Sequence, residues 1–142
     1  MNKELIKRGK IKLLGLVVAM LLICPKMEAE AAEETIIISC NQLENGDYYK
    51  NDVITHTYNA ATKEITLNEG YSFNLYDCTG YVEIINNRGI LNYMGGTVNR
   101  INNYGVIPMG DYNCSINNCG GTIKNGIFNQ SVDNQGTIEN GN

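Results

Sequence analysis

The stretch INNRGILNYMGGTVNRINNYGVI, residues 85–107, contains the phrase Asn-Asn-x-Gly twice within a short distance. The phrase returns in altered form as INNCGGTI (116–123) and as VDNQGTI (132–138). A repeat with a fixed period indicates a stacked structure, in which each copy is one unit that depends on its neighbours to bury its apolar side. This repeat therefore decides the fold class.

An asparagine, a glycine and an apolar residue each recur through the repeat, with spacings of 16, 15 and 16 residues. The preceding segment, 70–85, has the length and the apolar ending of a unit but lacks the Asn-Asn opening, and we interpret it as a divergent first coil. The positions that we predict to be structural are Asn87, Asn103, Asn118 and Asn134, then Gly89, Gly105, Gly120 and Gly136, and the apolar series Ile85, Ile101, Ile116 and Val132.

The composition of the repeat favours strands over helices. Each unit contains several glycines, which cost about 1 kcal/mol relative to alanine inside a helix, and asparagines, which favour turns. The remaining positions are rich in Ile, Val, Thr and Tyr, which suit strands. We therefore predict an all-β fold, a short parallel β-solenoid with coils of 15–16 residues. Its asparagines would form an amide ladder, and its isoleucines a buried apolar column.

An antiparallel meander is the competing fold. The pairs Asn45-Gly46, Asn125-Gly126 and Asn140-Gly141 are typical of two-residue hairpin turns. A meander, however, does not require the same corner residue in every second turn. The regular spacing favours the solenoid.

The segment before the repeat divides into two parts. Residues 1–31 have a basic head, an apolar run of 12 residues (13–24) and an Ala-x-Ala site, which predicts a secretory signal peptide cleaved after Ala31. The run is shorter than the roughly 20 residues that span a bilayer, which favours cleavage over an uncleaved membrane anchor. We expect no membrane span after cleavage, because no later segment is apolar and long enough to cross a membrane. Residues 32–69 read as an irregular β cap with strands at 34–40, 53–59 and 64–70, and residues 70–142 as the repeats.

The last unit stops part-way, at GTIENGN. Three interpretations stay open: a truncated relative of a longer protein, a frayed last coil, or an end that meets another molecule. The last of these includes end-to-end self-association.

The charge of the mature chain argues against nucleic acid as a partner. After residue 31 there are five basic and twelve acidic residues, a net charge of −7. An acidic surface with dispersed cations repels phosphate backbones.

Four cysteines follow the predicted cleavage site, Cys40, Cys78, Cys114 and Cys119. An exported chain permits two disulfides, and buried free thiols are the alternative. Cys114 and Cys119 stand on either side of a unit boundary, so we expect them to form a bridge, which would leave Cys40 and Cys78 to tie the cap to the first coil. A zinc site is disfavoured because the spacings contain no CxxC pair.

The phrases NxGxI and GTIxN resemble those of secreted bacterial parallel β-helix proteins, the pectate-lyase-like and adhesin-like group, over residues 70–142. The resemblance implies an exported β-helix, and in its enzyme members a cluster of aspartates that hold calcium, with an arginine as base. Asp77, Asp111 and Asp133 do not share a position in the unit, and neither do the two arginines of this region. We therefore expect no catalytic residue, no cofactor and no metal site.

The function that we expect is an exported, non-catalytic solenoid, secreted or at the cell surface, that serves binding or assembly. The alternative is a truncated or degenerate carbohydrate-active β-helix enzyme. The expected partners are carbohydrate or a surface protein. Nine tyrosines could present flat faces to such a partner, although strand packing explains them equally simply.

Overall fold

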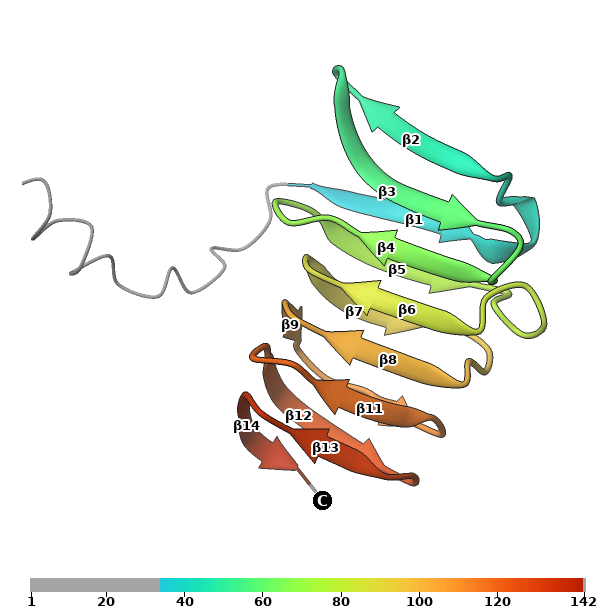
Figure 1. The fold of residues 1–142 in the computed structure, drawn as a ribbon. Helices are drawn as coiled ribbons and strands as arrows, with labels where there is room; N and C mark the ends of the chain where they lie inside the picture. Colours follow the sequence, from blue (N-terminus) through green and yellow to red (C-terminus); the bar gives the residue numbers. More distant parts are fainter. Residues whose placement is uncertain (1–33, 142) are drawn as a thin grey trace, which may run out of the picture. The chain divides into compact units, whose positions relative to one another are not determined.

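The computed structural model describes residues 34–141, which form a parallel β-solenoid of about five turns (Figure 1). The predicted fold class is therefore confirmed, and the antiparallel meander is excluded for the repeats. The elements are β1 (Thr35–Ser39), the short 3₁₀ helix η1 (Cys40–Gln42), β2 (Gly46–Lys50), β3 (Val53–Asn59), β4 (Glu64–Leu67), β5 (Ser72–Tyr76), β6 (Ile84–Asn87), β7 (Ile90–Met94), β8 (Arg100–Asn103), β9 (Val106–Ile107), β10 (Asp111–Tyr112), β11 (Ser115–Asn118), β12 (Thr122–Phe128), β13 (Val132–Asn134) and β14 (Thr137–Gly141).

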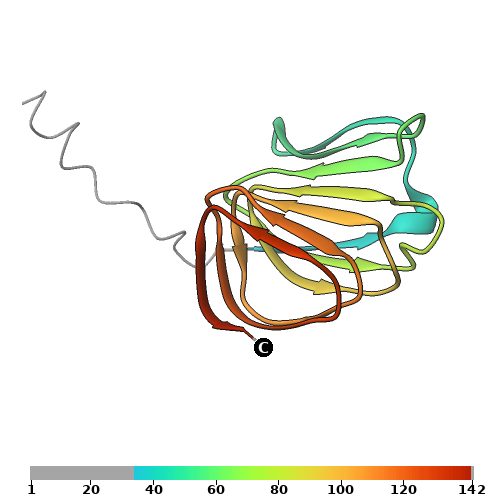
Figure 2. The same ribbon diagram turned by 60° about the horizontal axis from the view of Figure 1, so that its bottom comes forward.

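The strands form two sheets that face each other across the core. Figure 2 shows each coil passing through one sheet and returning through the other. One sheet has the order β13-β11-β8-β6-β4-β3-β2, and we call it the asparagine sheet because the Asn-Asn pairs lie in it. The other, which we call the opposite sheet, runs β1-β5-β7-β9-β12-β10, with β14 paired to β12. Two facing sheets give every coil an inner side to bury.

The apolar column of the asparagine sheet lies in register from coil to coil. Ile65 pairs with Ile85, Ile85 with Ile101, and Ile101 with Ile116. All four side chains are at most 1% exposed. The column ends at Val132, which pairs with Ile116 and is half-buried. Burial is therefore complete in the middle coils and partial in the last one, as expected where each coil is covered by the next.

The opposite sheet is interrupted in one coil by Pro108. This residue has no backbone N–H to donate to a ladder, and it separates β9 from β10. The neighbouring strand β12 is continuous and pairs with both pieces, Ile123 with Ile107 and Phe128 with Tyr112. The interruption leaves the coil-to-coil register intact.

The segment before the repeats covers one end of the stack. The strands β2, β3 and β4 pair antiparallel, and the rings of Tyr48 and His56 stack with centroids 4.3 Å apart. His56 also meets the edge of Phe73, a core residue of the first coil. Aromatic rings thus close this end of the core.

Two strands of the segment expected as a cap pair with strands of the repeats. Strand β4, which begins at Glu64, already pairs parallel with β6 in the coil register, and β1 pairs parallel with β5. The first coil thus begins inside the segment predicted as a cap. The alternation in EITLNEG identified the strand but not its partner, because pairing depends on residues distant in sequence.

The predicted signal peptide at residues 1–31 lies outside the described residues. Within residues 34–141, no helix is long and apolar enough to cross a membrane.

Candidate binding groove beside the disulfide

The predicted asparagines form a continuous ladder inside the asparagine sheet. The Nδ2 of Asn87 donates to Oδ1 of Asn103 (2.8 Å), Asn103 donates to Asn118 (2.8 Å), and Asn118 donates to Asn134 (2.7 Å). The first three side chains are fully buried, whereas Asn134 is exposed. These residues have the predicted structural role, because their amide groups satisfy one another inside the core.

Three of the four predicted glycines lie where coils meet. A Cβ atom on Gly105 would come within 2.1 Å of the Gly89 carbonyl oxygen, and one on Gly136 within 2.2 Å of the Gly121 carbonyl oxygen. Gly120 has the predicted structural role at a corner, but it is not the glycine that stacks on Gly105. Thr122 N–H donates to the Gly105 carbonyl, so Gly121 is the stacked residue. Gly120 is an additional corner residue with φ of +98° and open space around it.

The cysteine pairing is confirmed for one pair. Cys40 and Cys78 form a disulfide with their Cα atoms 4.8 Å apart. The reason is the pairing of β1 with β5, which places Ser39 opposite Tyr76, so that the residues after the two strands come together. Both cysteines are almost completely buried. The bridge ties the first described strand to the first coil.

The predicted bridge between Cys114 and Cys119 is wrong, because both are free thiols. The four residues of β11 separate them in an extended conformation. Five residues of strand span about 16 Å, whereas a disulfide requires Cα atoms within about 7 Å. Burial raises the pKa of the Cys114 thiol to about 11.

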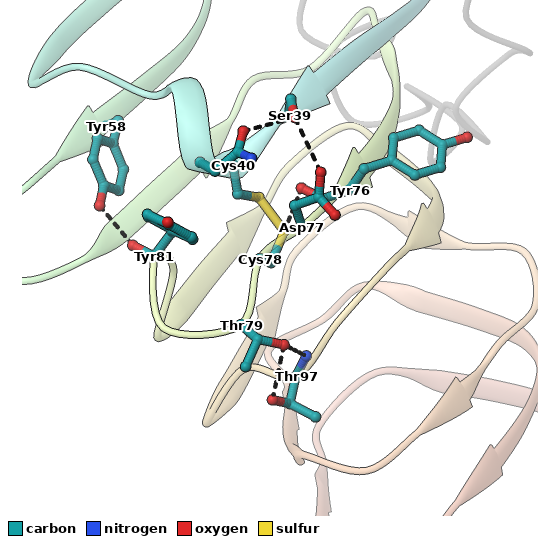
Figure 3. The surroundings of a disulfide bond; sticks show 10 residues. Ser39, Cys40, Tyr58, Tyr76, Asp77, Cys78, Thr79, Tyr81 and Thr97 are labelled. Atoms are coloured by element: carbon teal, nitrogen blue, oxygen red, sulfur yellow. Dashed lines mark hydrogen bonds between the residues drawn. A yellow bond between two sulfur atoms is a disulfide. The ribbon is translucent and has the colours of Figure 1, made fainter.

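The loop that follows β5 is held from several directions, as Figure 3 shows. The disulfide fixes Cys78, whose N–H also donates to the Gly95 carbonyl (3.1 Å). The Tyr58 hydroxyl donates to the Tyr81 carbonyl (2.6 Å). Asp77 has a left-handed backbone, with φ of +55°, and its carboxylate accepts a long hydrogen bond from Ser39 Oγ (3.4 Å). The loop is therefore preorganised by the cap, by β1 and by the next coil.

A hollow of about 550 Å³ opens over this loop, lined by Asn41, Tyr76, Asp77, Thr79, Tyr81 and the glycine pair 95–96. We call it the disulfide groove. Tyr76 and Tyr81 are 40% and 49% exposed, and in Figure 3 they lie on opposite sides of the disulfide. A Cβ atom on Gly96 would meet Thr79 at 2.9 Å, so the glycine allows the two coils to approach here.

The lining residues carry one formal charge, the carboxylate of Asp77, and no cation. The groups around it are neutral and polar: the Asn41 amide, the Thr79 hydroxyl and two phenols. Thr79 Oγ1 accepts a hydrogen bond from the backbone N–H of Thr97 (3.0 Å). The groove therefore combines exposed aromatic surface with a single anionic acceptor on a rigid support, which is the general composition of a binding site.

A second hollow, of about 640 Å³, lies on the opposite sheet between β10, β12 and β14. Its lining includes the exposed side chains of Met109 and Ile127. One wall is β14, which pairs only with β12 among the described strands. An edge strand supports a site less firmly than a disulfide-bonded loop does, and we therefore regard the disulfide groove as the candidate site.

The acidic residues that were considered for catalysis lie in different coils. Asp77 follows β5, Asp111 pairs with Ile127, and Asp133 pairs with Asn117. His56 is 5% exposed and packed between aromatic rings. Within residues 34–141, no group of three or more His, Cys, Asp and Glu residues is placed to hold a metal ion.

Sequence reasoning counted Tyr76 and Tyr81 among nine tyrosines without distinguishing them. It did not identify Asn41 or the glycine pair as their neighbours. The segment YDCTGY, residues 76–81, did contain a signal, since two tyrosines flank a cysteine and an aspartate. The pairing partner of that cysteine, which locates the groove, was not evident from the segment itself.

The chain matches no protein-family model, no curated protein and no solved structure. The solenoid of about five turns is consistent with a parallel β-helix style of repeat, and the comparisons add no support for a particular family.

Proposed function

We propose that this chain is an exported, non-catalytic β-solenoid that acts at the cell surface as a binding module, through the disulfide groove. The observation that carries the proposal is the groove itself: two exposed tyrosines and one carboxylate on a loop fixed by a buried disulfide. Exposed aromatic side chains on a rigid support are the usual energetic centres of recognition sites.

Two features support export. A disulfide forms and persists in oxidising compartments, and Cys40–Cys78 is buried and placed by strand pairing. The leader sequence 1–31 has the properties of a secretory signal. We further propose kinship with the secreted bacterial β-helix group, which the style of the repeat supports.

Binding can be tested with the mature chain, residues 32–142, labelled and applied to cells of the encoding organism and to a glycan array. We expect saturable binding that is lost in the double variant Tyr76→Ala/Tyr81→Ala. The matched control is Tyr49→Ala, which removes a tyrosine that is 63% exposed on β2, away from the groove. Absence of saturable binding, or binding that the double variant retains, would contradict the proposal.

Catalysis is tested separately, with lyase and hydrolase assays on pectin-like and other polysaccharides. Turnover that purifies with the wild-type chain would replace the binding module with the alternative, a degenerate or truncated carbohydrate-active enzyme. Mass spectrometry of the secreted chain tests export, with an N-terminus at Ala32 and an oxidised Cys40–Cys78 pair as the expected result.

A further inference from the structure

We infer that the disulfide groove binds the guanidinium or ammonium group of an arginine or lysine side chain on a partner protein. This inference rests on the proposed function and adds the chemical class of the ligand. The starting observation is that Asp77 supplies the only charge among the lining residues. A groove with one carboxylate and no cation repels anions and attracts cations.

The carboxylate of Asp77 has unused capacity to accept hydrogen bonds. Among residues 34–141, it accepts one hydrogen bond, from Ser39 Oγ at 3.4 Å. An ionised carboxylate offers about four lone-pair positions and can accept both N–H groups of a guanidinium fork. A cationic ligand would use this capacity, whereas an apolar ligand would remove water from the carboxylate and give nothing in return.

The two tyrosines add a second attraction for a cation. The faces of aromatic rings carry negative partial charge and attract cations, and arginine also stacks on them. Tyr76 and Tyr81 are 40% and 49% exposed and line the groove together with Asp77. The Asn41 side chain contributes an amide oxygen 2.9 Å from Ser39 Oγ, whose single hydroxyl hydrogen it shares with Asp77, and this oxygen can also accept from a ligand N–H group.

The charge of the whole chain favours the same class of ligand. Residues 32–142 carry a net charge of −7, which raises the local concentration of cationic partners and speeds their association. The rigidity of the loop lowers the entropic cost of binding, since Asp77 is held in its left-handed conformation between the disulfide and β5.

The test uses a pair of ligands that differ only in charge. The capped peptide Gly-Gly-Arg-Gly-Gly and its counterpart with citrulline, which is neutral and nearly the same shape, are titrated into the ¹⁵N-labelled mature chain. We expect the arginine peptide to shift the amide signals of Asn41, Asp77 and Tyr81, with an affinity at least tenfold above that of the citrulline peptide. The affinity should fall as ionic strength rises from about 0.01 to about 1 M, because the Debye length shortens from about 30 to about 3 Å.

The decisive variant is Asp77→Asn. Asparagine tolerates the left-handed backbone at this position, so the loop is expected to keep its conformation, and an unchanged spectrum outside the groove verifies this. The variant should bind the arginine peptide at least tenfold more weakly than the wild type does, and its affinity should fall less steeply with ionic strength, because only the attraction by the remaining net negative charge is left. Asp133→Asn, which removes an exposed carboxylate from β13, is the matched control and should bind as the wild type does.

The outcomes separate this inference from the proposed function. If the groove signals respond to a neutral or anionic oligosaccharide but not to the arginine peptide, the ligand class is wrong and the binding module stands. Equal binding of the arginine and citrulline peptides also overturns the ligand class. If no probe shifts the groove signals and the labelled chain does not bind cells, both proposals fail.

Discussion

At the scale of single residues, the buried asparagines explain why a polar side chain recurs in the core. Each Nδ2 has an Oδ1 partner in the next coil, so burial does not leave the donor unsatisfied. The ladder begins at Asn87, which lies opposite Leu67, a residue with no amide to donate. Among the described residues, the Asn87 Oδ1 consequently has no hydrogen-bond partner. An apolar side chain can thus occupy a ladder position, at the cost of one unsatisfied carbonyl.

Replacement of the middle rung should therefore be costly. The substitution Asn103→Leu leaves the buried Asn118 Oδ1 without its donor and removes the bond from Asn103 Nδ2 to the Gly105 carbonyl, while Asn87 Nδ2 keeps only the Val106 carbonyl as an acceptor. We expect a loss of about 3 kcal/mol in the free energy of unfolding, measured by urea denaturation, since each unsatisfied buried group costs about 1–3 kcal/mol. Asn134→Leu, at the exposed end, should cost less than about 1 kcal/mol. Equal losses at the two positions would show that the ladder does not contribute as the hydrogen bonds indicate.

His56 predicts a pH dependence of stability. Burial lowers the pKa of its imidazole from 6.5 to about 4 in the folded chain. At pH values between 4 and 6.5, the imidazole binds a proton more readily in the unfolded chain than in the folded chain. The free energy of unfolding therefore has its full value above pH 6.5 and falls as the pH approaches 4. The contribution is up to about 3 kcal/mol. Urea denaturation at several pH values should show this loss in the wild type and a smaller one in His56→Phe. Parallel pH profiles for the two chains would contradict the prediction.

At the scale of the element, the corners between strands decide the spacing of the coils. Gly105 and Gly121 lie where one coil contacts the next, whereas Gly120 has a left-handed backbone with open space. Two adjacent glycines thus have different roles: one allows close approach and the other allows the turn. Gly120 adds one residue to its corner. The spacing between successive ladder asparagines therefore differs there by one residue from the spacing between successive stacked glycines.

This difference predicts two distinct responses to substitution. Gly105→Ala places a Cβ atom against the Gly89 carbonyl oxygen, so the coils must separate, and overpacking of this kind costs about 1–3 kcal/mol. Gly120→Asn should cost about 1 kcal/mol or less, because asparagine adopts left-handed conformations readily. Thermal unfolding of the two variants compares them directly. A larger loss for Gly120→Asn would contradict the assigned register.

At the scale of the whole molecule, one covalent bond connects the beginning of the described chain to the stack. The disulfide closes a loop with a sequence separation of 38 residues, and it links β1 and η1 to the loop that carries the groove. The same bond therefore contributes to stability and to the shape of the candidate site.

Removal of this disulfide should lower both the stability of the chain and the affinity of the groove for its partner. For a loop of this length, the chain-entropy treatment gives a loss of about 4 kcal/mol. We expect Cys40→Ala/Cys78→Ala to unfold at lower urea concentration by a corresponding amount, and its groove to lose affinity for the partner. Cys119→Ser, which removes a free thiol, is the control and should change stability little. An unchanged unfolding midpoint in the double variant would show that strand pairing alone holds the cap.

The sequence by itself determined the fold class, the period of the coils, the inward side of the isoleucines and the stacking of the asparagines. These follow from local physics, because alternation, glycine corners and stacked identical residues are visible within a few consecutive units. The strands predicted at 53–59 and 64–70, of which the second ends earlier, at Leu67, the buried isoleucines and the asparagine ladder were predictable for this reason.

Only the tertiary structure decided which glycine stacks, which cysteines pair and where a groove lies. Gly120 and Gly121 are adjacent and chemically identical, and only contact with the neighbouring coil distinguishes them. Cys40 meets Cys78 because β1 pairs with β5, a contact between strands distant in sequence. The disulfide groove combines residues from three such segments, so its composition is a property of the stacked coils and not of any one unit.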